Sequence, residues 1–143
     1  MITSVFKKST PINLFLVVIL MLVFFFIHLF QDLTWTSSVV SILQKGGLFL
    51  IMLGSVFMAN FIAKKNGLSK DSSYTILFYF LFLMFFPSVF GNTNLFLSNF
   101  FIILALRRLI SLQSLKASKE KIFDASLWIF VASLFHFWCI LYL

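Results

Sequence analysis

The chain has 143 residues, of which 62% are hydrophobic and only 10% are charged. A soluble domain typically carries about 25% charged residues, so this chain has too few to cover a water-facing surface. The net charge of +7 is a feature of many nucleic-acid-binding proteins, but the cations here stand between long apolar runs, where membrane topology explains them. We therefore expect an all-α membrane protein that has the lipid bilayer, and no nucleic acid, as a partner.

The first apolar run covers residues 12–30 and follows a short polar leader. Ser9 or Thr10 can cap a helix that starts at Pro11, because proline at the first helical position loses no hydrogen bond. At about 1.5 Å per residue the run is roughly 28 Å long, enough to cross the hydrocarbon core. A signal-peptide core is shorter, about 7 to 15 residues. We expect a retained first span.

Residues 36–45 form an amphipathic piece with polar side chains on one side of a helical wheel. Trp35 beside it is a residue type enriched at membrane interfaces. The piece is expected to lie along the membrane surface or to form the tilted start of the next span. That second span is expected at residues 46–63. It carries small residues at every fourth position, a spacing that lets helices approach closely in lipid: Ser55, Ala59 and Ala63.

The pair Asn66-Gly67 predicts the end of the second span, because both residue types favour helix C-caps. Pro87 is expected to bend or end the third helix. The sequence shows no domain boundary, so we expect one transmembrane domain, an all-α bundle of about five spans. The remaining spans are expected at residues 74–90, 95–110 and 122–143.

The distribution of cations predicts the orientation of the bundle. With the amino terminus inside, the inner segments hold ten of the eleven Lys and Arg residues: Lys7, Lys8, Lys64, Lys65, Lys70, Arg107, Arg108, Lys116, Lys119 and Lys121. Only Lys45 lies outside. Positive charge concentrates on the cytoplasmic side of short loops. We therefore expect a multi-pass membrane protein with its amino terminus in the cytoplasm; the resemblance described below implies that this membrane is the bacterial inner (cytoplasmic) membrane.

The basic turn between the fourth and fifth spans holds three candidate binding residues: Arg107, Arg108 and Asp124. In an antiparallel hairpin Asp124 would meet the last turn of the fourth span, where an interfacial ion pair would lock the hairpin. Alternatively, the basic turn holds a lipid phosphate or pyrophosphate, for which arginine offers bidentate contacts. The sequence leaves both interpretations open.

A second layer of polar candidates is expected near the outer ends of the spans: His28, Asp32, Asn92, Asn94, Asn99 and His136. His28 and His136 lie at similar depths, roughly 21 to 24 Å from the inner ends of their spans. No H-x-x-x-H or similar spacing predicts a metal site. Single His and Asn residues in spans more often hydrogen-bond a neighbouring helix, and we expect this of His28, His136, Asn99 and Asn60.

Motifs of soluble enzymes are absent from the sequence. It contains no nucleophile elbow, no phosphate-cradling glycine loop and no paired catalytic carboxylates. Cys139 is the only cysteine, so no disulfide framework or thiolate cluster forms within the chain. No cofactor is expected.

Three stretches carry a resemblance that covers essentially the whole chain: MITSVFKKSTPINLFLVVIL, FIAKKNGLSKDSSY and NFFIILALRRLISLQSLKASKEKIFDASLWIFVASLFHFW. Together they resemble an uncharacterised family of bacterial multi-pass inner-membrane proteins. The resemblance implies a protein longer than 143 residues, so this chain is expected to be an amino-terminal part. It implies no mechanism.

More distantly, the arginine-rich inner turn followed by D-A-S-L-x-x-x-x-A-S-L is similar to helix pairs in lipid-linked-sugar glycosyltransferases and polysaccharide polymerases. Those enzymes place an acidic residue in the first outer loop, ahead of a surface-lying helix. The similarity therefore implies Asp32 as a catalytic candidate. The loop here, of about fifteen residues with one acid, is much shorter than in such enzymes.

Three roles stay open from the sequence. The first is envelope polymer assembly on a lipid-linked substrate at the outer face. The second is a non-catalytic membrane subunit or scaffold, whose small-residue face on the second span packs on a membrane protein partner. The third is a transporter, for which broken helices in corresponding halves are expected, whereas Pro87 is the only interruption in the sequence.

Overall fold

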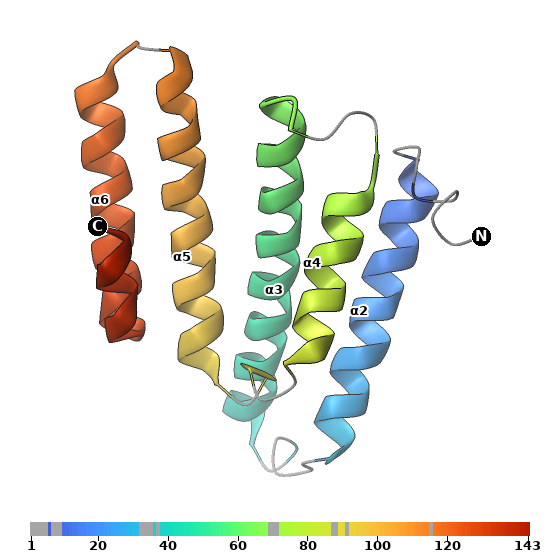
Figure 1. Ribbon diagram of the computed structural model, residues 1–143. Helices are drawn as coiled ribbons and strands as arrows, with labels where there is room; N and C mark the ends of the chain where they lie inside the picture. Colours follow the sequence, from blue (N-terminus) through green and yellow to red (C-terminus); the bar gives the residue numbers. More distant parts are fainter. Residues whose placement is uncertain are drawn as a thin grey trace. The chain divides into compact units, whose positions relative to one another are not determined.

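The computed structural model describes residues 6, 10–31, 36, 38–68, 72–86, 89–90, 92–114 and 116–143 (Figure 1). All regular secondary structure within these residues is helical, which confirms the all-α prediction. By its internal contacts the chain forms two compact units, Met1–Gly91 and Asn92–Leu143. Each unit is described by itself.

The first unit consists of three helices: α2 (Pro11–Gln31), α3 (Val39–Lys65) and α4 (Tyr74–Phe85). Helix α4 contacts both α2 and α3, and Figure 1 shows it beside each of them. Helix α2 begins at Pro11, as predicted, and the Thr10 carbonyl accepts the N–H of Asn13 at 3.1 Å. One stripe of α2 is buried, with a buried residue at every fourth position: Asn13, Val17, Met21, Phe25 and Leu29.

Helix α3 begins directly after Ser38, whose Oγ accepts a hydrogen bond from the Val40 N–H at 3.3 Å. The helix then continues without a break to Lys65. The amphipathic piece from Val39 to Lys45 is therefore helical and continuous with the second long helix. Residue 37, like Trp35, lies outside the described part of the chain.

Helix α3 ends at the predicted Asn66-Gly67 pair. Gly67 has a φ of +65°, the left-handed conformation that glycine adopts without steric cost. The N–H of Leu68 donates to the Ala63 carbonyl at 2.9 Å, and the N–H of Gly67 donates to the Lys64 carbonyl at 3.1 Å. This pair of hydrogen bonds is the Schellman motif, which satisfies carbonyl groups that a helix end otherwise leaves unpaired.

Helix α4 is shorter than the predicted third span, because it ends at Phe85 rather than residue 90. Phe86 has φ −122° and ψ 67°, which is not helical, and a residue before proline disfavours the helical region. Pro87 itself lies outside the described residues. The twelve residues of α4 extend about 18 Å, less than the roughly 30 Å of a hydrocarbon core.

The second unit is a helical hairpin. It consists of α5 (Thr93–Ile110), the 3₁₀ turn η3 (Ser111–Ser114), α6 (Ser118–Phe135) and the 3₁₀ segment η4 (Phe137–Tyr142). Helices α5 and α6 lie side by side (Figure 1). Ala125 and Ala132 of α6 are fully buried, and such small side chains let two helix backbones approach closely.

One aromatic ring of α5 joins the two helices. Phe101 stacks on Trp128, with ring centroids 5.7 Å apart and planes 15° apart. The same ring stacks on Phe135 at 5.7 Å and 12°. Trp128 and Phe135 are seven residues apart, so they lie on the same face of α6, two turns from each other. The Phe101 ring therefore contacts both of them, and the three rings form an aromatic stack along the hairpin.

The expected fifth span, 122–143, is not one continuous helix. Helix α6 ends at Phe135, and His136 is extended, with φ −143° and ψ 106°. The N–H of His136 donates to the Ala132 carbonyl at 3.0 Å, and the His136 carbonyl accepts the Cys139 N–H at 2.9 Å. This turn satisfies the backbone groups at the helix end and buries Cys139, while η4 packs back on α6 (Figure 1).

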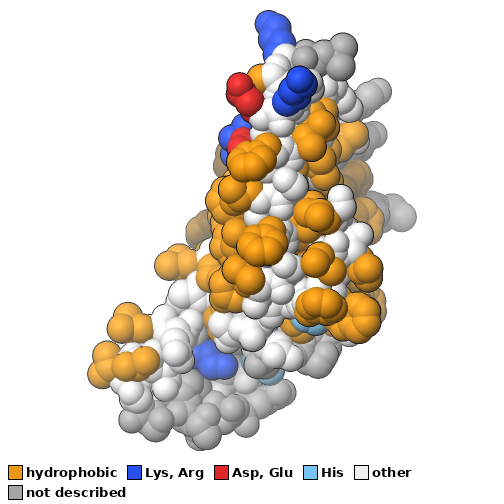
Figure 2. All heavy atoms as spheres, turned by 90° about the vertical axis from the view of Figure 1, so that its left-hand side faces the viewer, with side chains coloured by type: hydrophobic (Ala, Val, Ile, Leu, Met, Phe, Trp, Pro, Cys, Tyr) orange, Lys and Arg blue, Asp and Glu red, His pale blue; other side chains and the backbone are white. Residues whose placement is uncertain are grey.

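Three helical segments of the described chain are long and apolar enough to cross a membrane: Pro11–Phe30, Val39–Lys65 and Thr93–Gln113. They support the assignment of the chain as a membrane protein. Figure 2 shows hydrophobic side chains over much of the face seen from the α6 side, with most of the visible charged side chains at its upper end. Helix α6 has 18 residues but carries four charged side chains in its first two turns: Lys119, Glu120, Lys121 and Asp124.

Replacing Phe101 by alanine should weaken the hairpin. Each aromatic pair contributes about 0.5–1.5 kcal/mol beyond apolar burial, and Phe101 makes two such pairs. We therefore expect Phe101→Ala to lower the free energy of unfolding by about 1–3 kcal/mol. Detergent-induced unfolding of the full chain, followed by circular dichroism, measures this change. Phe130→Ala is the matched control, because Phe130 of α6 is 58% exposed. Equal effects of the two substitutions would contradict the role of the stack.

Candidate functional site

The most polar part of the second unit is the end of the hairpin where α5 passes into α6. Nη2 of Arg108, in the last turn of α5, lies 3.1 Å from Oδ2 of Asp124 in α6. The two side chains are 49% and 38% exposed, so water screens much of the attraction between them. This is the contact expected of an ion pair that fastens the hairpin.

A second polar contact joins the same helices. Lys121 Nζ donates a hydrogen bond to the Ser111 carbonyl at 2.8 Å, and Ser111 Oγ donates to the Arg108 carbonyl at 2.7 Å. Carbonyl groups at the end of a helix have no partner within the helix, and a cation there also interacts favourably with the helix dipole. Lys121 therefore acts as a cap for α5 that comes from α6.

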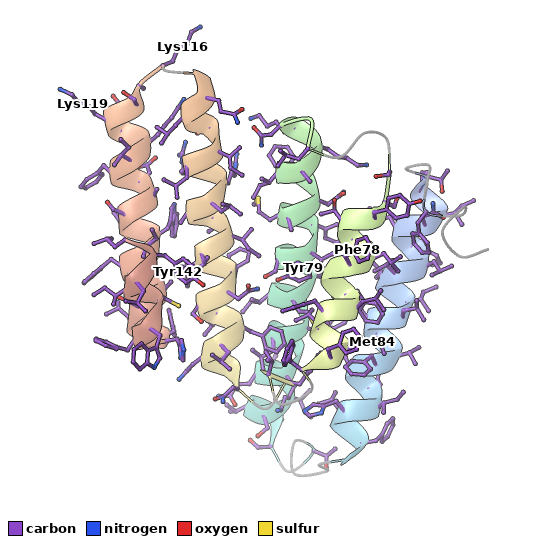
Figure 3. All side chains as sticks on the ribbon, viewed as in Figure 1. Phe78, Tyr79, Met84, Lys116, Lys119 and Tyr142 are labelled. Atoms are coloured by element: carbon purple, nitrogen blue, oxygen red, sulfur yellow. The ribbon has the colours of Figure 1, made fainter. Side chains whose placement is uncertain are left out.

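Two cations of the turn have a different placement. Lys116 and Lys119 are exposed, and Figure 3 shows their side chains pointing away from the end of the hairpin. An open hollow of about 430 Å³ is lined by Lys119 and three further residues of α6: Glu120, Phe123 and Asp124. Its two carboxylates repel a phosphate. The alternative in which this turn holds a lipid phosphate therefore gains no support from the hollow, and Arg107 lies exposed on α5 outside it.

The outer layer of candidates is divided between the two units. His28 lies in the first unit, where its ring centroid is 5.4 Å from that of Phe90. Phe90 in turn contacts Phe24 at 5.2 Å, so His28 is part of an aromatic cluster. His136 lies in the second unit and contributes its backbone to the turn after α6. Among the described residues no three His, Cys, Asp or Glu side chains lie close enough to hold a metal ion.

The other polar candidates have varied surroundings. Asn99 is half-buried within α5, and Asn92 and Asn94 are exposed at the start of that helix. Asn60 of α3 is buried, but its Oδ1 has no hydrogen-bond partner within the described residues, so the interhelical bond expected of it is not made by that oxygen. Asp32, the catalytic candidate, lies outside the described residues.

The small residues of α3 are placed mostly inside the structure. Ser55 is 1% exposed and Ala63 is 8% exposed, whereas Ala59 is half-buried. Ser55 Oγ donates to the Ile51 carbonyl of its own helix at 2.9 Å. The small-residue face of α3, which was expected to pack on a partner protein, is therefore largely covered by other residues of this chain.

An apolar groove between α2 and the first turns of α3 was not predicted from the sequence. It encloses about 270 Å³ and is lined by four residues of each helix: Leu22, Phe25, Phe26, Leu29, Ile42, Lys45, Gly46 and Phe49. The Phe25 and Phe49 rings are 5.1 Å apart, so the two helices touch there. Lys45 is the only charged residue of this lining. The available signal in the sequence was that Lys45 stands apart from the other cations.

The ion pair at the hairpin end predicts a measurable but small coupling. In a double-mutant cycle of Arg108→Gln and Asp124→Asn, we expect about 0.2–1 kcal/mol of coupling in the free energy of unfolding, because the pair is partly exposed. The coupling should fall as salt is raised from 0.01 to 1 M. A cycle that pairs Lys119→Gln with Asp124→Asn serves as the control. Zero coupling of Arg108 and Asp124 at low salt would contradict the assignment.

Comparison with known proteins gave no match, whether to protein-family models, to curated proteins or to solved structures. The charges at the helix ends, the hairpin contacts and the groove are therefore the basis for a functional proposal.

Proposed function

We propose that the chain is a multi-pass protein of the bacterial inner membrane, with its amino terminus and basic turns in the cytoplasm, that takes part in envelope polymer assembly on lipid-linked substrates. The observation that carries the membrane orientation is the placement of cations at helix ends. In the described part of the second unit, every Lys and Arg lies in the last turn of α5, the connecting turn or the first turn of α6. Such clusters mark cytoplasmic ends of spans.

The first unit has a similar asymmetry. Lys64 and Lys65 lie in the last turn of α3. The Phe6 carbonyl accepts a hydrogen bond from the Ser73 N–H at 3.0 Å, so Phe6 lies beside the residue that precedes α4. Positive charge at that end supports a cytoplasmic amino terminus.

The proposed activity depends on Asp32. This residue belongs to the connection between α2 and α3, which is at the opposite end of α3 from Lys64 and Lys65. A carboxylate at the outer surface is a residue type that acts as a general base on an acceptor hydroxyl. The similarity to glycosyltransferase and polymerase helix pairs supports the same position.

A specific observation favours a second function, that of a non-catalytic membrane subunit. At the hairpin end, Arg108 and Asp124 pair with each other, and Lys121 caps α5. These charged groups thus have structural roles that require no substrate. For this second function the partner would be a membrane protein. Of the three small residues on α3, Ser55 and Ala63 are buried and Ala59 is half-buried, so Ala59 is the most accessible to such a partner.

Cysteine labelling tests the orientation. In a Cys139→Ser background, we expect Asn94→Cys to react with a membrane-impermeant maleimide added to intact cells, because Asn94 lies at the end of α5 without cations. Ser118→Cys, at the start of α6, should react only after permeabilisation. The reverse pattern would overturn the proposed orientation. Reaction of both in intact cells would show that α5 does not cross the membrane.

Substitution of Asp32 separates the two functions. In cells that lack their own copy of the protein, Asp32→Asn should abolish restoration of surface polymer, measured by incorporation of labelled sugar, while membrane insertion remains intact. Asp71→Asn is the matched control, since it removes the other acid of the first unit from the opposite end.

For a non-catalytic subunit, Asp32→Asn should instead have no effect. Ala59→Leu should then release a co-purifying membrane protein, because the larger side chain separates packed helices. Phe57→Leu, at an exposed position of the same helix, should leave that complex intact.

A further inference from the structure

The second unit carries charged or polar side chains at both ends, and these limit the part of the hairpin that fits into hydrocarbon. At one end is the Arg108–Asp124 pair, whose side chains are 49% and 38% exposed. Charged groups that face lipid in the bilayer core are costly, so this pair marks the level of the lipid headgroups. At the other end, Asn92 and Asn94 are exposed at the start of α5, and α6 ends at His136.

The distance between these two levels is short on both helices. From Asn94 to Arg108 the rise along α5 is roughly 21 Å. From Asp124 to His136 the rise along α6 is roughly 18 Å. Segment η4 packs back on α6 and therefore adds no length beyond His136. The candidate span Thr93–Gln113 is longer only because it continues past Arg108.

The first unit supplies a reference for an ordinary bilayer. The segment Pro11–Phe30 of α2 contains no Lys, Arg, Asp or Glu and rises roughly 30 Å. In α3, Lys45 and Lys64 are roughly 28 Å apart along the helix. Both lengths match a hydrocarbon core of about 30 Å. The hairpin is thus shorter than the core by roughly 10 Å.

The hairpin cannot make up this difference by itself. A tilt reduces the thickness that a helix covers. Long cationic side chains can reach toward the headgroups, but Nη2 of Arg108 is held 3.1 Å from Asp124, whose short side chain cannot extend. The bilayer therefore becomes thinner beside this unit, which is a common response to a short hydrophobic stretch.

The α6 side of the hairpin also carries two hydroxyl groups between the two polar levels. Ser126 and Ser133 are half-buried and lie seven residues apart, on one face of the helix. Each Oγ donates a hydrogen bond to a carbonyl of its own helix, at 2.8 Å and 2.6 Å. A hydroxyl oxygen can accept hydrogen bonds while it donates one. The two serines therefore offer acceptors at a depth where lipid tails offer none.

We propose that the α5–α6 hairpin thins the bilayer beside it and thereby speeds the movement of phospholipid from one leaflet to the other. A phospholipid that changes leaflet carries its charged headgroup through the hydrocarbon core. The cost of a charged group there falls where the bilayer is thin and water penetrates. The argument uses lengths within the second unit, so it holds in either orientation of the hairpin. It does not depend on the proposed role in polymer assembly.

A lipid-flipping assay tests the proposal on the full chain. The protein is reconstituted into phosphatidylcholine vesicles that contain a trace of fluorescent NBD-phosphatidylethanolamine, and dithionite is added outside. In protein-free vesicles only the dye of the outer leaflet is bleached. With the protein, we expect dye from the inner leaflet to be bleached as well. A soluble fluorophore trapped in the vesicles shows that dithionite does not leak in.

Two matched variants test the role of thickness. Combining Arg107→Leu, Arg108→Leu and Asp124→Leu extends the uncharged part of α6 to Lys121, by roughly 5 Å. We expect lipid movement to slow about tenfold, which corresponds to about 1.4 kcal/mol in the barrier. Combining Arg107→Gln, Arg108→Gln and Asp124→Asn breaks the same ion pair but keeps polar side chains at this level, so most of the rate should remain. Circular dichroism checks that both variants are folded.

The unaltered thickness of the hairpin has a second readout that needs none of these variants. In a Trp35→Phe chain the remaining tryptophans are Trp128 and Trp138 of the second unit, so their fluorescence reports the lipid contacts of this unit. Quenching by brominated phosphatidylcholines measures relative lipid binding. We expect short myristoleoyl chains to bind more strongly than long erucoyl chains, because a thin bilayer matches the hairpin.

Three results would overturn the proposal. The first is bleaching no greater than in protein-free vesicles. The second is an equal loss of rate in the leucine and amide variants, which would show that the ion pair rather than the thickness matters. The third is stronger binding of the long-chain lipid. Since these readouts follow lipid movement and lipid binding, they are independent of whether Asp32→Asn affects polymer assembly.

Discussion

The constraint on which the rest of this structure depends is the hydrogen bonding of the backbone in an apolar environment. A helix satisfies its own N–H and C=O groups except at its ends, where about four of each remain. Several polar and charged residues in the described part of this chain lie at such ends. Ser38 caps the start of α3, Gly67 closes its end, and Lys121 serves the end of α5. Arg108, Asp124 and Lys121 at the hairpin end therefore have structural roles in holding α5 and α6 together.

Helix ends were also what the sequence could predict best, because the signals for them are local. Pro11 fixes its own φ, and Gly67 reaches the left-handed region without strain, whatever packs around them. The Arg108–Asp124 contact follows almost as directly, since a short turn between antiparallel helices brings those positions together. Fold class and the long helices are likewise consequences of composition and run length.

What the sequence could not predict depends on which helix faces meet. Residues 136–143 are as apolar as the helix before them, so run length favoured one continuous span, whereas the chain turns at His136 and packs back on α6. The Phe101 stack and the groove between α2 and α3 likewise depend on which helix faces meet. Twenty-two phenylalanines present many equivalent rings, and only the packing of two helices decides which ring meets which. Asp32 stays a prediction from the sequence.

The two units therefore differ in how they treat charge. In the hairpin, Arg108 and Lys121 find partners within the chain, so their desolvation is balanced by contacts that also hold α5 and α6 together. Lys45 stands in an apolar groove in a unit whose described residues contain no acid. Charge thus holds the hairpin together, whereas the contacts described for the first unit are mainly apolar, such as that between the Phe25 and Phe49 rings.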